Sequence, residues 1–231
     1  MPEIDIIKDL AKQVLLIPNA EGRLINFLWD RAERLVRNVE IISRLPELSN
    51  SGIPIDHFCL TTATYFSETG SSCYFTTRTN GKKTTSSNGN GHDSDLDNTI
   101  SIVTEKLSGT VKPARIEKIC KIITESTNHS TRMIEGMVLS DARNLDDMGA
   151  TGIFNEIRRF AFSGKGVCDV VQNWQNKLDY QYWQARLKEG FRFEQVRKLA
   201  EQRLSNTESF MNLLKMEAEG QDIEEFLLTS I

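Results

Sequence analysis

Apolar residues recur at spacings of three and four along most of this chain, and this periodicity constrains the fold more than any other feature of the sequence. Such spacing places apolar side chains on one face of an α-helix. In residues 23–45 the predicted face consists of Ile25, Leu28, Ala32, Leu35, Val39 and Ile42, and the helix should end at Pro46. In residues 112–127 a second helix should start at Pro113 and bury Ile116, Ile119, Cys120 and Ile123.

Several later segments show the same spacing, whereas alternating patterns typical of strands and the turns typical of hairpins are nearly absent. The sequence therefore predicts an all-α fold, a single helical bundle. With 231 residues the chain can bury a substantial core without disulfides or metals, so we expect one domain over residues 1–231.

One segment interrupts the helical pattern. Residues 68–98 are rich in Gly, Ser, Thr and Asn and contain few apolar residues. Such a composition cannot bury much apolar surface. We expect a long, irregular and flexible insertion within the helical domain.

Composition limits the function classes. The chain has 28 basic and 32 acidic residues and a net charge of -4, which gives no general attraction for a polyanion, so we expect no nucleic-acid partner.

No segment approaches the ~20 apolar residues of a membrane span, and the first residues do not resemble a signal peptide. The 4 cysteines lack CxxC spacing, which favours free thiols in a reducing compartment and a cytoplasmic location.

Residues 137–154, "MVLSDARNLDDMGATGIF", combine apolar residues with three acids and two glycines. One interpretation is a helix whose acids, Asp141, Asp146 and Asp147, face water or cap the next helix. The other is a functional cluster of carboxylates. The local pattern alone leaves both open.

Residues 135–153, "EGMVLSDARNLDDMGATGI", resemble a segment of the HD superfamily of all-α, metal-dependent phosphohydrolases. The resemblance covers about residues 100–219 well and residues 24–66 weakly. It implies that Asp141 stands at the position of the last metal ligand and that Asp146 is the second acid of the motif. It also implies that His129, in a segment similar to the family's I-x-x-H-S, lies near that site.

The same resemblance shows departures at the other ligand positions of the H…HD…D signature. Arg31 stands where the first histidine is expected, and Tyr65 and Phe66 stand where the His-Asp pair is expected. Imidazole and carboxylate groups hold the ion that activates water in such enzymes, so Asp141 alone could not support that chemistry. We instead expect a pair between an arginine such as Arg31 and the carboxylate of Asp141, because a buried carboxylate without a metal needs a partner.

Three functional hypotheses follow. The first is an inactive HD-like protein without a cofactor, in which Arg31, His129 and Asp146 serve binding of a small phosphorylated ligand or of a protein partner. The second is an active phosphohydrolase whose rearranged site holds a divalent metal through His57, His129, Asp141 and Asp146. The third is a helical interaction protein outside the superfamily.

Aromatic residues cluster in "NWQNKLDYQYW", residues 173–183. They could stack on a nucleobase, but aromatic residues at helical spacing usually fill a core. The residues in question are Trp174, Tyr180, Tyr182 and Trp183.

Overall fold

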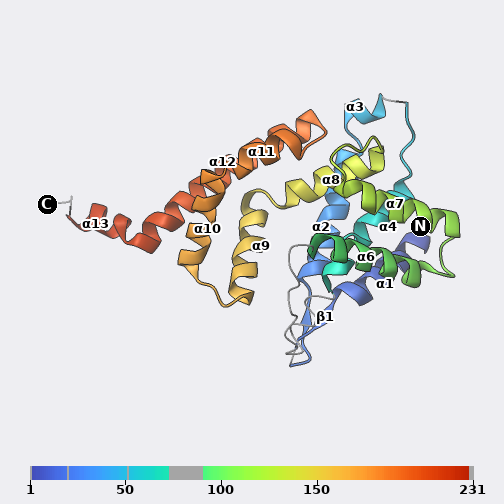
Figure 1. Ribbon diagram of the computed structural model, residues 1–231, viewed down its shortest axis with the longest axis horizontal. Helices are drawn as coiled ribbons and strands as arrows, with labels where there is room; N and C mark the ends of the chain where they lie inside the picture. Colours follow the sequence, from blue (N-terminus) through green and yellow to red (C-terminus); the bar gives the residue numbers. More distant parts are fainter. Residues whose placement is uncertain (1, 20, 51, 73–90, 229–231) are drawn as a thin grey trace. The chain divides into compact units, whose positions relative to one another are not determined.

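Helices form nearly all of the secondary structure in the computed structural model, which describes residues 2–19, 21–50, 52–72 and 91–228 (Figure 1). Within these ranges the strands are β1 (Ile17–Pro18) and β2 (Leu24–Ile25), which pair antiparallel. The prediction of an all-α fold is confirmed. No described helix has both the length and the apolar character needed to cross a membrane.

The β1–β2 hairpin was not predicted, because the turn side chain that closes it gives no periodic signal. The Oδ1 atom of Asn19 accepts hydrogen bonds from the N–H groups of Glu21 and Arg23 at 3.0 and 2.8 Å. Asn side chains commonly close turns in this way. Ile25, predicted to begin the first helical face, therefore lies in β2 instead.

Helix α2 (Phe27–Ile42) buries the remaining residues of the predicted face. The helix ends at Ile42, before Pro46, and Pro46 instead begins the short helix α3 (Pro46–Ser49). Proline suits a helix start because the first N–H groups have no partner within the helix. The buried residues that were predicted correctly are Leu28, Ala32, Leu35, Val39 and Ile42.

Helix α4 (His57–Phe66) lies at the centre of the N-terminal part of the fold. It packs against α1 (Pro2–Leu15), α2 and α7 (Pro113–Thr127). Seven of its residues are buried, which agrees with this central position: Cys59, Leu60, Thr62, Ala63, Thr64, Tyr65 and Phe66.

Helix α7 begins at Pro113 as predicted, but its buried stripe is rotated from the expected one. Ile119 and Ile123 are buried, whereas Ile116 and Cys120 are only partly buried. Ile122 is fully buried instead. The predicted helical spacing was correct, but the buried face of α7 is rotated towards Ile122 and away from Ile116 and Cys120.

The predicted insertion over residues 68–98 is wrong at both ends. Residues 69–72 are helical, and residues 91–98 belong to α6 (Gly91–Leu107); residues 73–90 lie outside the description. Small polar residues can be buried here because their hydroxyls donate to backbone carbonyls, as Thr69 does to Phe66 at 2.7 Å and Ser72 to Thr69 at 2.6 Å. The composition of residues 68–98 therefore led us to predict less helix than this segment forms.

The chain divides into two compact units, Met1–Ala142 and Arg143–Ile231. The boundary falls inside α8 (Ile134–Asp146). The single domain over residues 1–231 stays a prediction.

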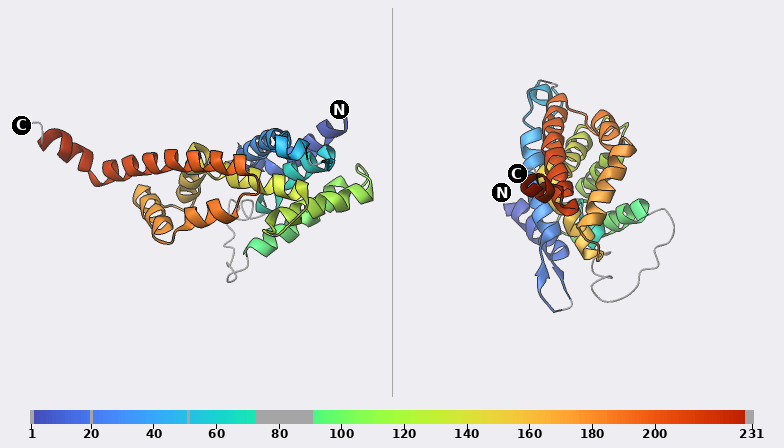
Figure 2. Two further views of the ribbon diagram at one scale, coloured as in Figure 1. Left: turned by 90° about the horizontal axis from the view of Figure 1, so that it is seen from above. Right: turned by 90° about the vertical axis from the view of Figure 1, so that its left-hand side faces the viewer.

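In the second unit a long helix, α12 (Glu194–Glu219), packs against every other helix of that unit that follows α8 (Figure 2). Its partners are α9 (Gly149–Phe162), α10 (Val167–Asp179), α11 (Tyr182–Glu189) and α13 (Gln221–Leu228). This arrangement makes α12 the helix on which the second unit is assembled.

Candidate functional site

Arg31 forms an ion pair with Glu68 inside the first unit. Arg31 lies on α2, and Glu68 lies in the turn that follows α4. The Nε atom of Arg31 is 3.4 Å from Oε2 of Glu68, and their side chains are 18% and 9% exposed. A guanidinium and a carboxylate at this distance, largely away from water, neutralise each other's charge.

Tyr65 and Phe66 are core residues. The ring of Tyr65 stacks on that of Trp29, with centroids 5.8 Å apart and planes inclined by 7°. Burial, the largest influence on this phenol, raises the pKa of Tyr65, which therefore stays protonated. Phe66 is fully buried. Neither side chain provides the imidazole or carboxylate that the superfamily signature would require.

Asp141 lies on α8 and has no exposed surface. Asp146, at the end of the same helix, is also buried. The interpretation in which these two acids face water is therefore wrong. Buried carboxylates need hydrogen bonds or opposite charges to offset the loss of hydration. Asp141 and Asp146 therefore each have a structural or functional role, unlike acids on a solvated helix face.

Asp146 and Asp147 belong to the second unit, where arginines approach them. Burial lowers the pKa of the Arg203 guanidinium, and the negative charge of Asp146 opposes this effect. Arg203 also donates to the carbonyl of Leu145 at 2.8 Å. Arg186 donates to Oδ2 of Asp147 at 2.7 Å. These contacts join α11 and α12 to the junction between α8 and α9.

The predicted site residues come from both compact units. Arg31, His129 and Asp141 belong to the first unit, and Asp146 belongs to the second. His129 is exposed, in the turn after α7. Among the residues whose side chains are described, no group of three or more His, Cys, Asp or Glu residues is arranged to hold a metal ion. The binding roles predicted for Arg31, His129 and Asp146 stay predictions.

A second charged cluster, at the start of α4, was not predicted from the sequence. The ammonium of Lys118 lies 3.2 Å from Oδ2 of Asp56 and 3.1 Å from Oε1 of Glu135. Asp56 caps α4 by accepting from the N–H of Cys59 at 3.0 Å, and its own N–H donates to Glu135 at 3.2 Å. An aspartate just before a helix predicts the cap, but nothing in the sequence indicates the lysine 62 residues away.

A small pocket lies among α9, α10, α11 and α12 of the second unit. Trp174 and Trp183 form part of its wall, with ring centroids 5.5 Å apart and planes tilted by 42°. Both rings are buried, whereas Tyr180 and Tyr182 are exposed. The core interpretation is correct for the tryptophans, and their tilt does not form a parallel stacking platform.

Glu156, one of the two carboxylates that line this pocket, already has a cationic partner. Glu156 accepts from the ammonium of Lys177 at 2.6 and 2.7 Å, and Asn173 also donates to it. Lys177 in turn lies 5.1 Å from the centre of the Trp183 ring. These interactions stabilise the packing of α9 against α10.

No family model and no curated protein matches this chain. Among solved structures, YpgQ from Bacillus subtilis is similar over 94% of this chain and 97% of its own, with 19% identity and a TM-score of 0.59. YpgQ in complex with ADP gives 18% identity and a TM-score of 0.60, with the same coverage. The Lin1889 protein from Listeria innocua is similar over 95% of this chain and 98% of its own, at 17% identity and a TM-score of 0.56. At these identities the likeness shows a shared fold.

Proposed function

We propose that this chain is a degenerate HD-superfamily protein that has lost the hydrolytic metal site and keeps its scaffold for binding. The observation that carries the proposal is the Arg31–Glu68 ion pair. Arg31 is a cation at a position expected for a metal ligand, so it repels a divalent ion. It also pairs with the carboxylate of Glu68, which could otherwise have helped to bind such an ion.

The residues at the expected ligand positions do not fit a divalent ion. Arg31 is a cation, Phe66 has no donor atom, and Tyr65 is a protonated phenol packed on Trp29. Asp141 is the one residue of the four with the chemistry of a ligand. A single carboxylate supplies too few ligands for a transition metal, which commonly takes three or four from the protein.

The proposed ligand is a small phosphorylated molecule of the nucleoside diphosphate class. This choice is supported by the similarity of the fold to that of YpgQ, one structure of which is in complex with ADP. Binding without a metal would use hydrogen bonds and cationic side chains to hold the phosphates.

Calorimetric titration with ADP, with and without Mn²⁺, tests this proposal. The expected result is ADP binding that does not depend on Mn²⁺, with no phosphate released over hours of incubation. Phosphate release that requires Mn²⁺ would contradict the proposal.

The variant Asp141→Asn tests the alternative hypothesis, in which the chain is an active phosphohydrolase with a rearranged metal site. If this substitution abolishes Mn²⁺-dependent phosphate release while the circular dichroism spectrum is unchanged, the chain is an active phosphohydrolase with a rearranged site. His57→Ala and His129→Ala would then show whether these histidines are ligands. Under our proposal there is no release for any of these variants to abolish.

A further inference from the structure

The end of the second unit is a helical arm, residues 212–228, which comprises the last turns of α12 and the whole of α13. Met211 is the last buried residue of α12. No described side chain after it is buried. Gly220, with φ of 72°, ends α12 and allows the chain to turn into α13. In Figures 1 and 2 the arm extends beyond α9, α10 and α11.

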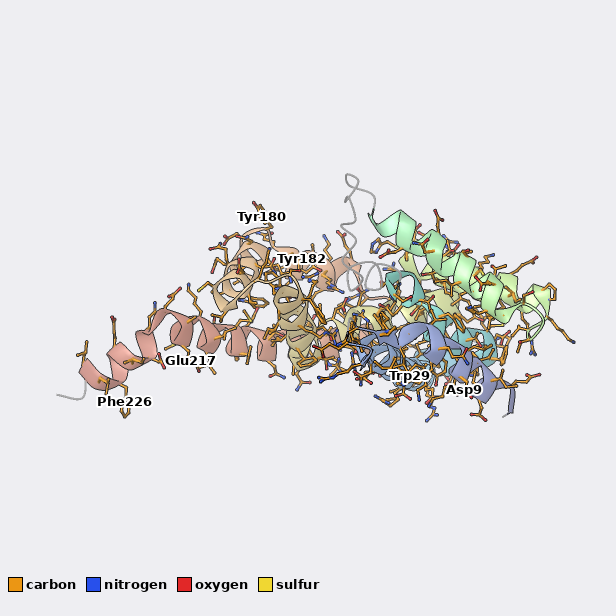
Figure 3. All side chains as sticks on the ribbon, turned by 90° about the horizontal axis from the view of Figure 1, so that it is seen from below. Asp9, Trp29, Tyr180, Tyr182, Glu217 and Phe226 are labelled. Carbon is orange, nitrogen blue, oxygen red and sulfur yellow. The ribbon has the colours of Figure 1, made fainter. Side chains whose placement is uncertain are left out.

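The tip of this arm is both apolar and acidic. Ile223, Phe226 and Leu227 have spacings of three and four on α13 and are 58%, 75% and 59% exposed. Asp222 and Glu224 flank Ile223 in the sequence. Figure 3 shows Phe226 near the end of the arm, well beyond the labelled Glu217 of α12. Such an exposed apolar face is typical of a surface that binds another protein.

Helix α9 of the same unit presents an apolar face with basic residues. Phe154, Ile157 and Phe162 are 64%, 37% and 47% exposed. Arg159 of α9 and Lys165, in the segment that follows α9, are exposed and lie over the ring of Phe160 on the same helix. The acidic arm and the basic α9 face therefore have complementary charges and similar apolar character.

We propose that the arm of one copy of this chain binds the α9 face of a second copy, in a reciprocal dimer. The occupant is a second copy because α12 carries the arm away from the α9 of its own chain (Figure 2). A two-fold arrangement forms each arm–α9 contact twice, which doubles the apolar area buried. The inference is independent of the proposed loss of the metal site.

Light scattering coupled to gel filtration tests the dimer. The wild-type protein should have the mass of two chains of 26.2 kDa. In the arm variant, Ile223→Asp with Leu227→Asp, the dissociation constant of the dimer should rise by more than about 100-fold, as expected when apolar anchors of an interface are removed. The face variant, Phe154→Asp, should have the same effect. Circular dichroism should show that both variants stay folded.

A matched control replaces an exposed apolar residue of the first unit. Ile41→Asp, at a position that is 66% exposed, should leave the dimer intact. Mixing the arm variant with the face variant should restore a dimer, because one arm and one α9 face in such a pair are still intact. This restoration would not occur if the substitutions acted only through folding.

Three results would overturn the inference. They are a monomeric wild-type protein, a dimer that both variants leave unchanged, and mixtures of the two variants that remain monomeric. A monomer that binds vesicles of phosphatidylserine and phosphatidylcholine through the same residues would assign the two faces to a lipid surface instead.

Discussion

Arg31 and Glu68 form the contact on which the proposed function depends, and their side chains are largely shielded from water. Removal of one member of such a pair leaves the other charge buried, which costs about 3 kcal/mol. We therefore predict that Arg31→Met lowers the free energy of unfolding by about that amount. The double variant Arg31→Met with Glu68→Met should lose clearly less stability than the sum of the single variants. Chemical denaturation measures all three values.

An exposed pair of the same first unit provides the control. Lys8 and Glu33 are 3.0 Å apart, with side chains 42% and 32% exposed. Glu33→Gln should change stability by less than about 1 kcal/mol, because water screens such pairs. Equal losses for Arg31→Met and Glu33→Gln would contradict the buried character of the Arg31–Glu68 pair.

Asp56 makes stability depend on pH. Burial acts to raise its pKa, but the hydrogen bond from the N–H of Cys59 and the charge of Lys118 outweigh burial and lower the pKa below 3.8. The folded protein thus binds a proton at Asp56 less readily than the unfolded chain does. Its contribution is fully present above about pH 4 and is lost as the pH falls through the folded-state pKa.

We predict that Asp56→Asn flattens the decline of stability below pH 4 and costs up to about 1 kcal/mol at pH 7, because the neutral amide still caps α4 but loses the charge interaction with Lys118. Urea denaturation at a series of pH values measures both effects. An unchanged acid profile in Asp56→Asn would show that Asp56 is not the titrating group.

The thiol of Cys59 should be inert. Burial, followed by the neighbouring carboxylate of Asp56, raises its pKa to about 12. Only the thiolate reacts with alkylating agents, so Cys59 should remain unmodified in native protein at pH 8. Cys168 is exposed and should react. Peptide mass spectrometry after timed labelling distinguishes the two, and rapid native modification of Cys59 would contradict the packing of α4.

At the scale of elements, Gly70 allows α6 to pack closely against the segment that follows α4. A Cβ atom at this position would lie 2.0 Å from the carbonyl oxygen of Asp95 and 2.5 Å from the hydroxyl of Thr99. The backbone must move to relieve such a clash. We predict that Gly70→Ala lowers the free energy of unfolding by more than about 2 kcal/mol. Thermal denaturation measures the loss.

Gly166 is the matched control, because an added Cβ would meet nothing within 4 Å there. Gly166→Ala should change stability by less than about 1 kcal/mol. If the two alanine variants were equally stable, α6 would not approach Gly70 as closely as the structure shows.

The helices that bury regular apolar stripes were predictable, as α2 shows, because burial on one face requires a period close to 3.6 residues. Two elements were not. The β1–β2 hairpin depends on hydrogen bonds to one asparagine, and the first turns of α6 depend on contacts with a distant segment. In that region Gly70 donates its N–H to the Thr99 hydroxyl at 3.0 Å. Such contacts join residues far apart in the sequence and leave no local pattern.

At the scale of the whole molecule, the all-α fold was predictable, but the partner of one candidate site residue was not. The sequence resemblance singled out Arg31, Tyr65, Phe66 and Asp141, and the structure buries the last three. It did not identify Glu68 as the partner of Arg31, because a charge pair between separate elements depends on tertiary packing.

The most direct test of the central claim is the amount of divalent metal that the protein binds. The measurement is equilibrium dialysis against Mn²⁺, followed by elemental analysis, for wild type and for Asp141→Asn. Because a cation, a phenol and a phenyl ring stand at three of the four expected ligand positions, we predict far less than one ion per chain in both proteins. One tightly held ion per wild-type chain that Asp141→Asn abolishes would contradict the loss of the metal site.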